Sequence, residues 1–277
     1  SLMQNHSLNN NLAIDVCDPV GIQALQNRYN YHLSNAQILT ESARSIKSED
    51  EIMCLRASIS VAKIGIEEML KNLIAGITEE ELWAYMHKIN IENGGEWFET
   101  RLLSSGPRTN PWLQECSNRI IQKGDLVAFD TDMVGPYGYC ADISRTFVEG
   151  GELTLEQKKL HNLAVEQVKY NEKLIKPGIT FREFSEKAWK LPDNCYDNHY
   201  PCQIHGIGMC DEWPFIKYPN KDFSNGDFNA FFEENMTICL ESYIGEVGGK
   251  EGVKIEDQYL VTKNGLELLS KLPLDQL

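Results

Sequence analysis

The stretch 124–147, GDLVAFDTDMVGPYGYCADISRTF, places acidic residues inside two runs that are otherwise typical of β-strands. Asp130 and Asp132 are two residues apart, so on a regular strand their side chains share a face. Asp142 follows in the second run. Carboxylates are scarce in strand interiors because a buried charge without a partner is costly. The stretch therefore indicates a strand pair that carries an acidic site.

A second strand pair later in the chain has the same property. Glu241 lies in MTICLESYI, residues 236–244, and Glu256 lies in GVKIEDQYLVT, residues 252–262. These glutamates occupy the places that Asp130 and Asp142 occupy in the first pair. The repetition predicts two related halves.

Two helices are expected before each strand pair. Their first residues are marked by the S/T-x-x-E/Q pattern of a capping box. The four matches are Ser48 with Glu51, Thr78 with Glu81, Thr154 with Gln157, and Thr180 with Glu183. The first opens a long amphipathic helix, and the others predict helices over about 79–91, 155–174 and 181–190. The sequence thus predicts an α+β fold of two pseudo-symmetric ααββ halves, which form one curved, mainly antiparallel sheet backed by helices.

The first 40 residues are expected to lie outside this catalytic domain, which spans 41–277. The start, SLMQNHSLNNN, resembles a cloning scar, and residues 12–40 predict a strand, a short helix near Pro19 and another strand. This is too little for an independent domain. We expect 1–40 to be a scar followed by the remnant of a truncated amino-terminal domain.

Composition limits the function classes. The 277 residues carry a net charge of −15, which argues against nucleic-acid binding. No apolar run approaches the roughly 20 residues of a membrane span, and no signal peptide is recognised, so a cytoplasmic protein is expected. The eight cysteines lack CxxC pairs and several lie in apolar runs, which indicates buried reduced thiols.

The strand carboxylates would repel one another in a sheet interior unless cations neutralised them. Aspartate and glutamate oxygens with one imidazole suit divalent Mn, Fe, Co or Zn. His205, in the glycine-flanked HGIG segment that we expect to form a turn, would supply the imidazole. Taken singly, each acidic residue could instead belong to a solvated strand face, and His205 could be a catalytic base or a plain turn residue.

Several segments resemble the methionine aminopeptidase/prolidase superfamily, which has the pita-bread fold. They are GDLVAFDTDMVGPYGYCADISRTF, HGIGMCDEWP, LESYIGEVGGKEGVKIEDQYLVTKNG and the lead-in ESARSIKSEDEIMCLRAS. The resemblance covers about residues 40–270. It implies a site for two divalent metal ions formed by Asp130, Asp142, His205, Glu241 and Glu256. It also implies that residues 12–40 are the end of an amino-terminal domain.

The chain departs from the peptidases of that superfamily at the residues that handle the peptide. Trp112 lies near the place of one expected histidine, and Glu212 stands where another is expected, seven residues after His205. The glycine that often follows two residues after the first aspartate is Asp132. These departures retain the metal ligands and remove the peptide-cleaving histidines.

The combination of D-T-D, H-G-I-G-x-C-D-E-W-P and E-S-Y-I-G-E-V-G-G resembles one branch of the superfamily, the metal-dependent dimethylsulfoniopropionate lyases. The resemblance implies a homodimer in which Asp132 joins the ligands, Asp211 is the catalytic base and Tyr200 assists. The implied reaction is β-elimination, which releases dimethyl sulfide and acrylate from a small zwitterion. An aromatic wall suits its sulfonium, and the candidates are Trp213, Trp112, Tyr139, Tyr137 and Tyr200.

Two other functions stay open at this stage. An Xaa-Pro-type dinuclear metallopeptidase, either dipeptidase or aminopeptidase, is the function that fold similarity alone would suggest. A non-catalytic binding member of the superfamily is the second, although such proteins tend to lose metal ligands. The retained ligand set argues against the latter, and the absent histidines argue against the former.

Overall fold

The computed structural model describes residues 10–219 and 229–274. The chain divides into two compact units, Ser1–Arg44 and Ser45–Leu277. Each is described by itself.

The first unit contains the predicted strand, helix and strand. Strands β1 (Asn11–Ile14) and β2 (His32–Asn35) pair in parallel, and helix α2 (Pro19–Tyr29) connects them. Helix α3 (Gln37–Arg44), which the sequence did not predict, ends the unit. That this unit is the remnant of a larger domain stays a prediction.

The second unit contains the four predicted helices: α4 (Glu49–Asn72), α5 (Glu79–Glu92), α6 (Leu155–Glu172) and α7 (Phe181–Lys187). Reciprocal capping boxes begin α4, α5 and α6, where the cap hydroxyl and the third helical residue satisfy each other's backbone amides. At α7 the Thr180 hydroxyl accepts from the Glu183 amide. Helices α6 and α7 end slightly earlier than predicted.

The main sheet has eight strands within the described ranges. Its order is β10-β9-β11-β12-β8-β5-β4, with β13 also paired to β12, and every pairing is antiparallel. The strands are β4 (Leu103–Ser105), β5 (Leu126–Asp130), β8 (Ser144–Val148), β9 (Ile204–Ile207), β10 (Asp211–Ile216), β11 (Thr237–Gly245), β12 (Gly252–Thr262) and β13 (Gly265–Leu268). Short 3-10 helices cover Gly106–Thr109, Pro136–Gly138 and Asp193–Asn198.

The first predicted strand pair is broken in the middle. Its inner parts, β6 (Met133–Val134) and β7 (Cys140–Ala141), form a separate three-stranded sheet with β3 (Trp97–Phe98). The break between β5 and β6 falls at Asp132, whose φ of 36° is left-handed and incompatible with a strand. Asp130 and Asp132 are therefore not on one regular strand, which corrects that part of the prediction.

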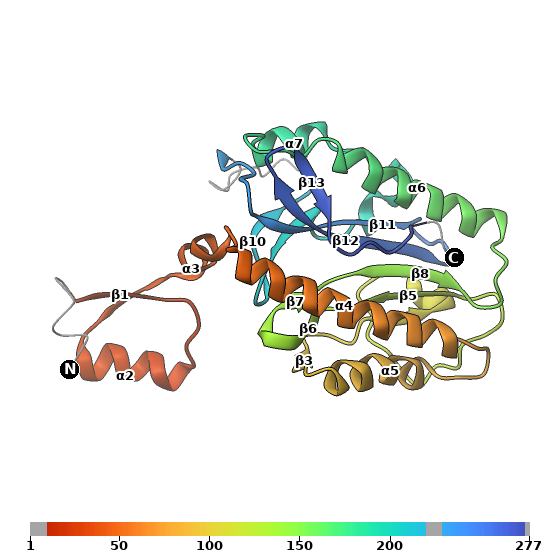
Figure 1. Cartoon of the computed structure of the whole chain (residues 1–277), viewed down its shortest axis with the longest axis horizontal. Coiled ribbons are helices and arrows are strands. Elements are labelled where there is room, and N and C mark those ends of the chain that lie inside the picture. The colour runs from red at the N-terminus through yellow and green to blue at the C-terminus, as the bar shows by residue number, and fades with distance from the viewer. Residues whose placement is uncertain (1–9, 220–228, 275–277) are drawn as a thin grey trace. The chain divides into compact units, whose positions relative to one another are not determined.

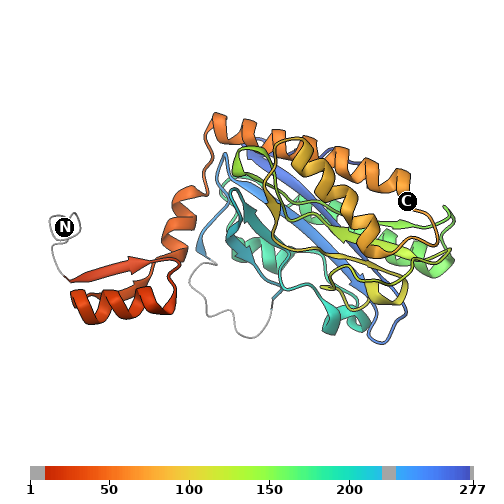
Figure 2. The same ribbon diagram turned by 90° about the horizontal axis from the view of Figure 1, so that it is seen from below.

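One face of the main sheet packs against helices and the other carries polar residues. On β12, Val253, Ile255 and Val261 belong to a hydrophobic core shared with α6 and α7. Phe129 on β5 belongs to a second core, shared with α4 and α5. Figure 1 shows α6 beside β11 and β12, and Figure 2 shows α4 and α5 lying across the strands of the first half. Glu256, Ser144 and Asp130 are aligned across the strands, so their side chains share one face of the sheet. Ile255 and Phe129, each one residue away, point to the opposite face, where the helices of both halves pack.

The two halves join along one edge-to-edge contact between β12 and β8, where Glu256 pairs with Ser144. Each half contributes two helices and a strand pair, so the predicted α+β pita-bread architecture is confirmed. No helix in residues 10–219 or 229–274 combines the length and apolar character that a bilayer crossing requires.

Candidate metal centre

The polar face of the sheet carries two adjacent rows of side chains. In the first row, the strand register places Cys239 opposite His205 on one side and opposite Gln258 on the other. The side-chain oxygen of Gln258 accepts a hydrogen bond from the Asp142 amide at 3.3 Å, which brings Asp142 to the end of this row. Three neighbouring strands of the second half, β9, β11 and β12, thus form a row that ends at Asp142 of the first half.

The second row crosses the seam between the halves. Glu241 pairs with Glu256, Glu256 with Ser144, and Ser144 with Asp130. Because side chains alternate along a strand, Cys239 and Glu241 share one face of β11, and Glu256 and Gln258 share one face of β12. Four of the predicted ligands thus lie in neighbouring rows with His205. All five are buried: Asp130, Asp142, His205, Glu241 and Glu256.

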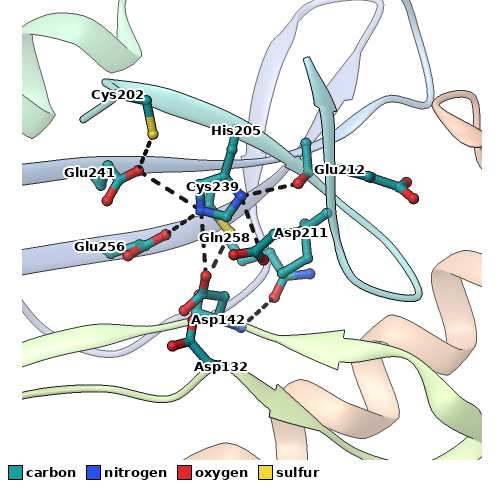
Figure 3. Close-up of polar contacts among 12 residues, drawn as sticks. Asp132, Asp142, Cys202, His205, Asp211, Glu212, Cys239, Glu241, Glu256 and Gln258 are labelled. Atoms are coloured by element: carbon teal, nitrogen blue, oxygen red, sulfur yellow. Dashed lines mark hydrogen bonds and ion pairs between the residues drawn. The ribbon is translucent and has the colours of Figure 1, made fainter. Parts of the chain in front are cut away.

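His205 is the centre of one group of contacts (Figure 3). Its Nε2 atom lies 3.0 Å from Glu256 Oε1, 3.4 Å from Asp142 Oδ2 and 3.8 Å from Glu241 Oε1. Burial alone would lower the pKa of His205, but the nearby acids, Asp211 first, raise it well above its usual value. The imidazole therefore faces the same carboxylates that the sequence predicts as its fellow ligands.

His205 does not lie in a turn, contrary to the prediction. It belongs to β9, which pairs with β10 and β11. A Cβ atom on the following residue, Gly206, would lie 2.2 Å from the Trp213 carbonyl oxygen. The glycine thus permits close approach of the β10 backbone and does not mark a turn.

Lys254 is the centre of a second group of contacts, and the sequence did not predict it. Its Nζ atom lies 2.9 Å from Glu241 Oε2 and 3.2 Å from Asp130 Oδ2, and it also contacts Glu256 Oε2. It donates to Ser144 Oγ at 3.0 Å. The lysine side chain is fully buried, so the negative charge of these carboxylates offsets the cost of burying its ammonium group.

Glu256 joins the two groups, since Oε1 faces His205 and Oε2 faces Lys254. Burial would raise the pKa of Glu256, but Lys254 and His205 hold it well below its usual range. Burial, with the charge of Glu256, raises the pKa of Glu241 to about 7. Burial and the same neighbour raise the pKa of Asp142. The buried side chains of the two rows, together with Lys254, are termed the cage. The cage thus holds more acids than its two basic side chains, His205 and Lys254, can keep ionised.

The donor set fits divalent cations. Asp130 Oδ1 and Asp142 Oδ1 are buried without a hydrogen-bond partner among the described residues, and such oxygens are costly unless something positive binds them. Two groups have ligand atoms within 4.8 Å of one another: Asp142, His205, Cys239 and Glu256, and Asp130, Asp132 and Asp142. Carboxylate oxygens with one imidazole suit Mn, Fe, Co or Zn.

Asp132 lies next to the cage rather than in the rows. Its Oδ2 atom accepts a hydrogen bond from the Thr100 hydroxyl. Burial and the charge of Asp130 raise the pKa of Asp132 well above its usual value. Its left-handed φ of 36° is the conformation that glycine adopts most readily.

Asp211 and Glu212, although adjacent, point to different surroundings (Figure 3). Asp211 Oδ1 lies 3.7 Å from His205 Nδ1, and its side chain is 45% exposed. Enclosure by the surrounding protein raises the pKa of Asp211. Glu212 is fully buried and pairs with Lys47, which lies 165 residues earlier in the chain. The residue at the place of the expected peptidase histidine thus contacts a lysine.

Two of the predicted aromatic residues lie on the Lys254 side of the cage. The Tyr200 ring centroid is 4.6 Å from Lys254 Nζ, and burial raises the pKa of Tyr200. Trp112 is in the same small hydrophobic cluster as Tyr200 and stacks on Tyr243, with the ring centroids 6.3 Å apart.

Three other predicted aromatic residues have different surroundings. Trp213 packs edge-on against Phe181, with centroids 5.4 Å apart, in the core of the second half. The Tyr139 hydroxyl donates to Glu51 on α4 at 3.1 Å, and burial together with this contact raises the pKa of Tyr139 to about 12. Tyr137 is 74% exposed. A role for these residues in substrate binding stays a prediction.

Sequence reasoning missed three side chains of the cage, and strand alternation could have found each of them. Lys254, Cys239 and Ser144 are each two residues from a predicted ligand, so each shares its face. A lysine on a strand is usually solvent-exposed, which is why charge alone did not single out Lys254.

The chain matches known proteins over nearly its whole length. The model of metallopeptidase family M24 matches residues 53–263. A dimethylsulfoniopropionate lyase of Roseovarius nubinhibens is 38% identical, over 96% of this chain and 61% of its own. An Xaa-Pro dipeptidase of Pyrococcus horikoshii is 30% identical, over 82% of this chain and 63% of its own. The chain thus spans about three fifths of the length of these curated relatives.

Solved structures share the fold. The prolidase of Pyrococcus horikoshii superimposes with a TM-score of 0.83 at 27% identity, covering 100% of this chain and 78% of its own. The prolidase of Pyrococcus furiosus gives 0.81 at 24% identity, covering 95% and 76%. The family match spans both strand pairs and every residue of the cage. The chain therefore belongs to metallopeptidase family M24.

Proposed function

We propose that this protein is a metal-dependent carbon–sulfur lyase that cleaves dimethylsulfoniopropionate into dimethyl sulfide and acrylate. The observation that carries the proposal is the position of Asp211: a half-exposed carboxylate next to a buried cage, 3.7 Å from His205. The 38% identity to a dimethylsulfoniopropionate lyase supports the substrate.

The cage residues would hold two divalent ions. The proposed ligands are Asp130, Asp132, Asp142, His205, Glu241 and Glu256, with Mn, Fe, Co or Zn as the candidate metals. Bound cations would supply Lewis-acid polarisation of the substrate carboxylate, which makes the adjacent C–H more acidic.

Asp211 would act as the general base. It takes a proton from the carbon next to the substrate carboxylate, and the C–H electron pair forms the new double bond. The C–S bond breaks at the next carbon, and its electron pair leaves with dimethyl sulfide. The proton stays on Asp211, whose exposed side chain can return it to water. Acrylate is the remaining product, so atoms and charge balance.

The sulfonium end of the substrate needs an apolar, electron-rich surface. Tyr200 and Trp112 are the best-placed aromatic residues, because they lie in one small cluster on the Lys254 side of the cage. A cation over an aromatic ring contributes about 0.5–2 kcal/mol. Tyr200 could also assist the proton transfer, and Trp213 and Tyr139 remain further candidates for the substrate pocket.

Xaa-Pro dipeptide hydrolysis is the second candidate, because the family and the dipeptidase relative favour it. Glu212 argues against it. This residue occupies the place of an expected peptidase histidine, yet its carboxylate is buried against Lys47. It offers no imidazole to a scissile peptide bond. The proposal also includes a homodimer, as the resemblance implies, and a cytoplasmic location.

A side-by-side substrate assay tests the proposal. Purified protein loaded with each candidate metal is given dimethylsulfoniopropionate in one series and Xaa-Pro dipeptides in another. Headspace chromatography measures dimethyl sulfide, and a ninhydrin assay measures proline. The proposal expects sulfide without proline. Proline release without sulfide would replace the lyase with the dipeptidase.

A further inference from the structure

Cys239 lies in the centre of the first row of the cage. It belongs to β11, pairs directly with His205 on β9, and is fully buried. Because strand side chains alternate, it shares a face with Glu241. The thiol therefore lies on the polar face of the sheet, at the boundary between the ligand side chains and a small hydrophobic cluster of Val134, Cys140 and Ile207.

The sulfur lies among oxygen and nitrogen donors. One ligand atom each from Cys239, His205, Asp142 and Glu256 fall within 4.8 Å of one another, a spacing that one ion can bridge. The Cys239 thiol makes a long contact, 3.8 Å from its sulfur to the Asp142 carbonyl oxygen. Asp142 Oδ1 is buried without a hydrogen-bond partner in the described part of the chain. Figure 3 shows the sulfur next to the imidazole.

We propose that Cys239 is a sulfur ligand of the metal ion bound next to His205. With Asp142 and Glu256 it completes a four-residue set of one sulfur, one nitrogen and two carboxylates. This inference rests on the metal-binding part of the proposed function and is independent of its substrate. Thiolate and imidazole favour Zn, Fe or Co over Mn and Mg.

The second group of ligand atoms within 4.8 Å of one another offers only carboxylate oxygens among the described residues, from Asp130, Asp132 and Asp142. The two metal positions therefore differ in kind, with a thiophilic ion at His205 and a harder ion at the all-oxygen position. A second buried thiol, Cys202, donates to Glu241 Oε1 at 2.9 Å and lies outside both ligand groups, so it is a matched control.

Cobalt absorption tests the sulfur ligand. The full chain is loaded with Co(II), and a thiolate-to-cobalt charge-transfer band is sought in the near ultraviolet. The proposal expects the band in the wild type and in Cys202→Ser, and its loss in Cys239→Ser. Zinc affinity relative to manganese should fall in Cys239→Ser by at least the roughly tenfold loss that removal of an outer-shell partner causes. A band that survives in Cys239→Ser overturns the proposal.

X-ray absorption of the zinc-loaded wild type keeps the test independent of the variant's folding. The proposal expects a sulfur neighbour of zinc at about 2.3 Å. A shell of nitrogen and oxygen alone would reject Cys239 as a ligand, whichever substrate the protein turns over. Absence of lyase activity in a protein that shows the sulfur neighbour would reject the proposed function and leave this inference intact.

Discussion

The two halves of the catalytic unit share an architecture but contribute different chemistry. Helices α4 and α5 with strands β5 and β8 correspond to α6 and α7 with β11 and β12. The ionisable side chains that the first half supplies are all acids, at strand ends and a turn: Asp130, Asp132 and Asp142. The second half supplies two glutamates from within long strands, together with an imidazole, an ammonium and a thiol.

This difference shows how a duplicated scaffold can hold an asymmetric site. The backbone repeat places carboxylates at corresponding positions, which produces an excess of negative charge at the seam. The second half then adds His205, Lys254 and Cys239. The basic groups that face the carboxylates, and the nitrogen and sulfur donors, therefore all come from this half. Substitutions in each half, and at the seam between them, test this comparison.

Glu256→Gln should have the largest effect, because one carboxylate at the seam serves both groups of contacts. We expect metal affinity to fall more than the roughly 100-fold that loss of an outer-shell partner can cause. Metal content after dialysis, measured by plasma mass spectrometry, checks this. Glu267→Gln, at a partly exposed ion pair, is the control. Retention of the full metal content in Glu256→Gln would show that this carboxylate at the seam is not needed to bind metal.

Lys254→Met should destabilise the metal-free protein more than the metal-loaded protein. The ammonium neutralises Asp130, Glu241 and Glu256, and removing one partner of a buried ionic group costs about 3 kcal/mol. Bound cations would compensate the same carboxylates. Urea unfolding should therefore show a lower free energy of unfolding for the metal-free variant and a much smaller loss with metal. Equal losses in both states would show that the lysine acts only in packing.

Asp132→Gly should stabilise the metal-free protein. The left-handed φ of 36° costs a non-glycine residue about 1 kcal/mol, and the substitution also removes a carboxylate next to Asp130. We expect the free energy of unfolding to rise by about 1 kcal/mol, measured in urea. Asp132→Asn removes the charge and keeps the backbone demand, so it separates the two causes. A less stable Asp132→Gly would mean that the Thr100 contact outweighs both.

The helix caps give the smallest expected difference between the halves. Hydrogen bonds from Thr78 lower the pKa of Glu81 at the start of α5, whereas Gln157, at the same position of the capping box of α6 in the second half, cannot titrate. A lowered pKa means that the cap is fully stabilising above the unfolded-state pKa of Glu81 and loses this contribution as pH falls through the folded-state value. An NMR titration should move the Thr78 amide resonance in that range and leave that of Thr154 unchanged.

Local signals predicted the elements well. The capping hydroxyls of Ser48, Thr78 and Thr154 begin helices where expected, because the cap is formed by residues three apart. Strand β12 has the bounds, 252–262, that its apolar run predicts. Such features depend on neighbours in sequence, so the sequence alone contains the information.

Long-range contacts could not be predicted in the same way. Glu212 turns toward Lys47, and nothing in the HGIGMCDEWP segment indicates a partner so far away. The register shift between Glu212 and Phe215 breaks the alternation that would have assigned the faces of β10. Burial of Lys254 likewise depends on three strands meeting at the seam. These are properties of the assembled sheet.

The most direct test of the proposed lyase is proton NMR of metal-loaded protein with dimethylsulfoniopropionate, for the wild type and Asp211→Asn. The wild type should produce acrylate and dimethyl sulfide in equal amounts. Asp211→Asn should lose at least about 100-fold in rate, as expected for a general base, while retaining its metal content. Unchanged turnover in Asp211→Asn, or a wild type that consumes no substrate in any metal form, would contradict the account.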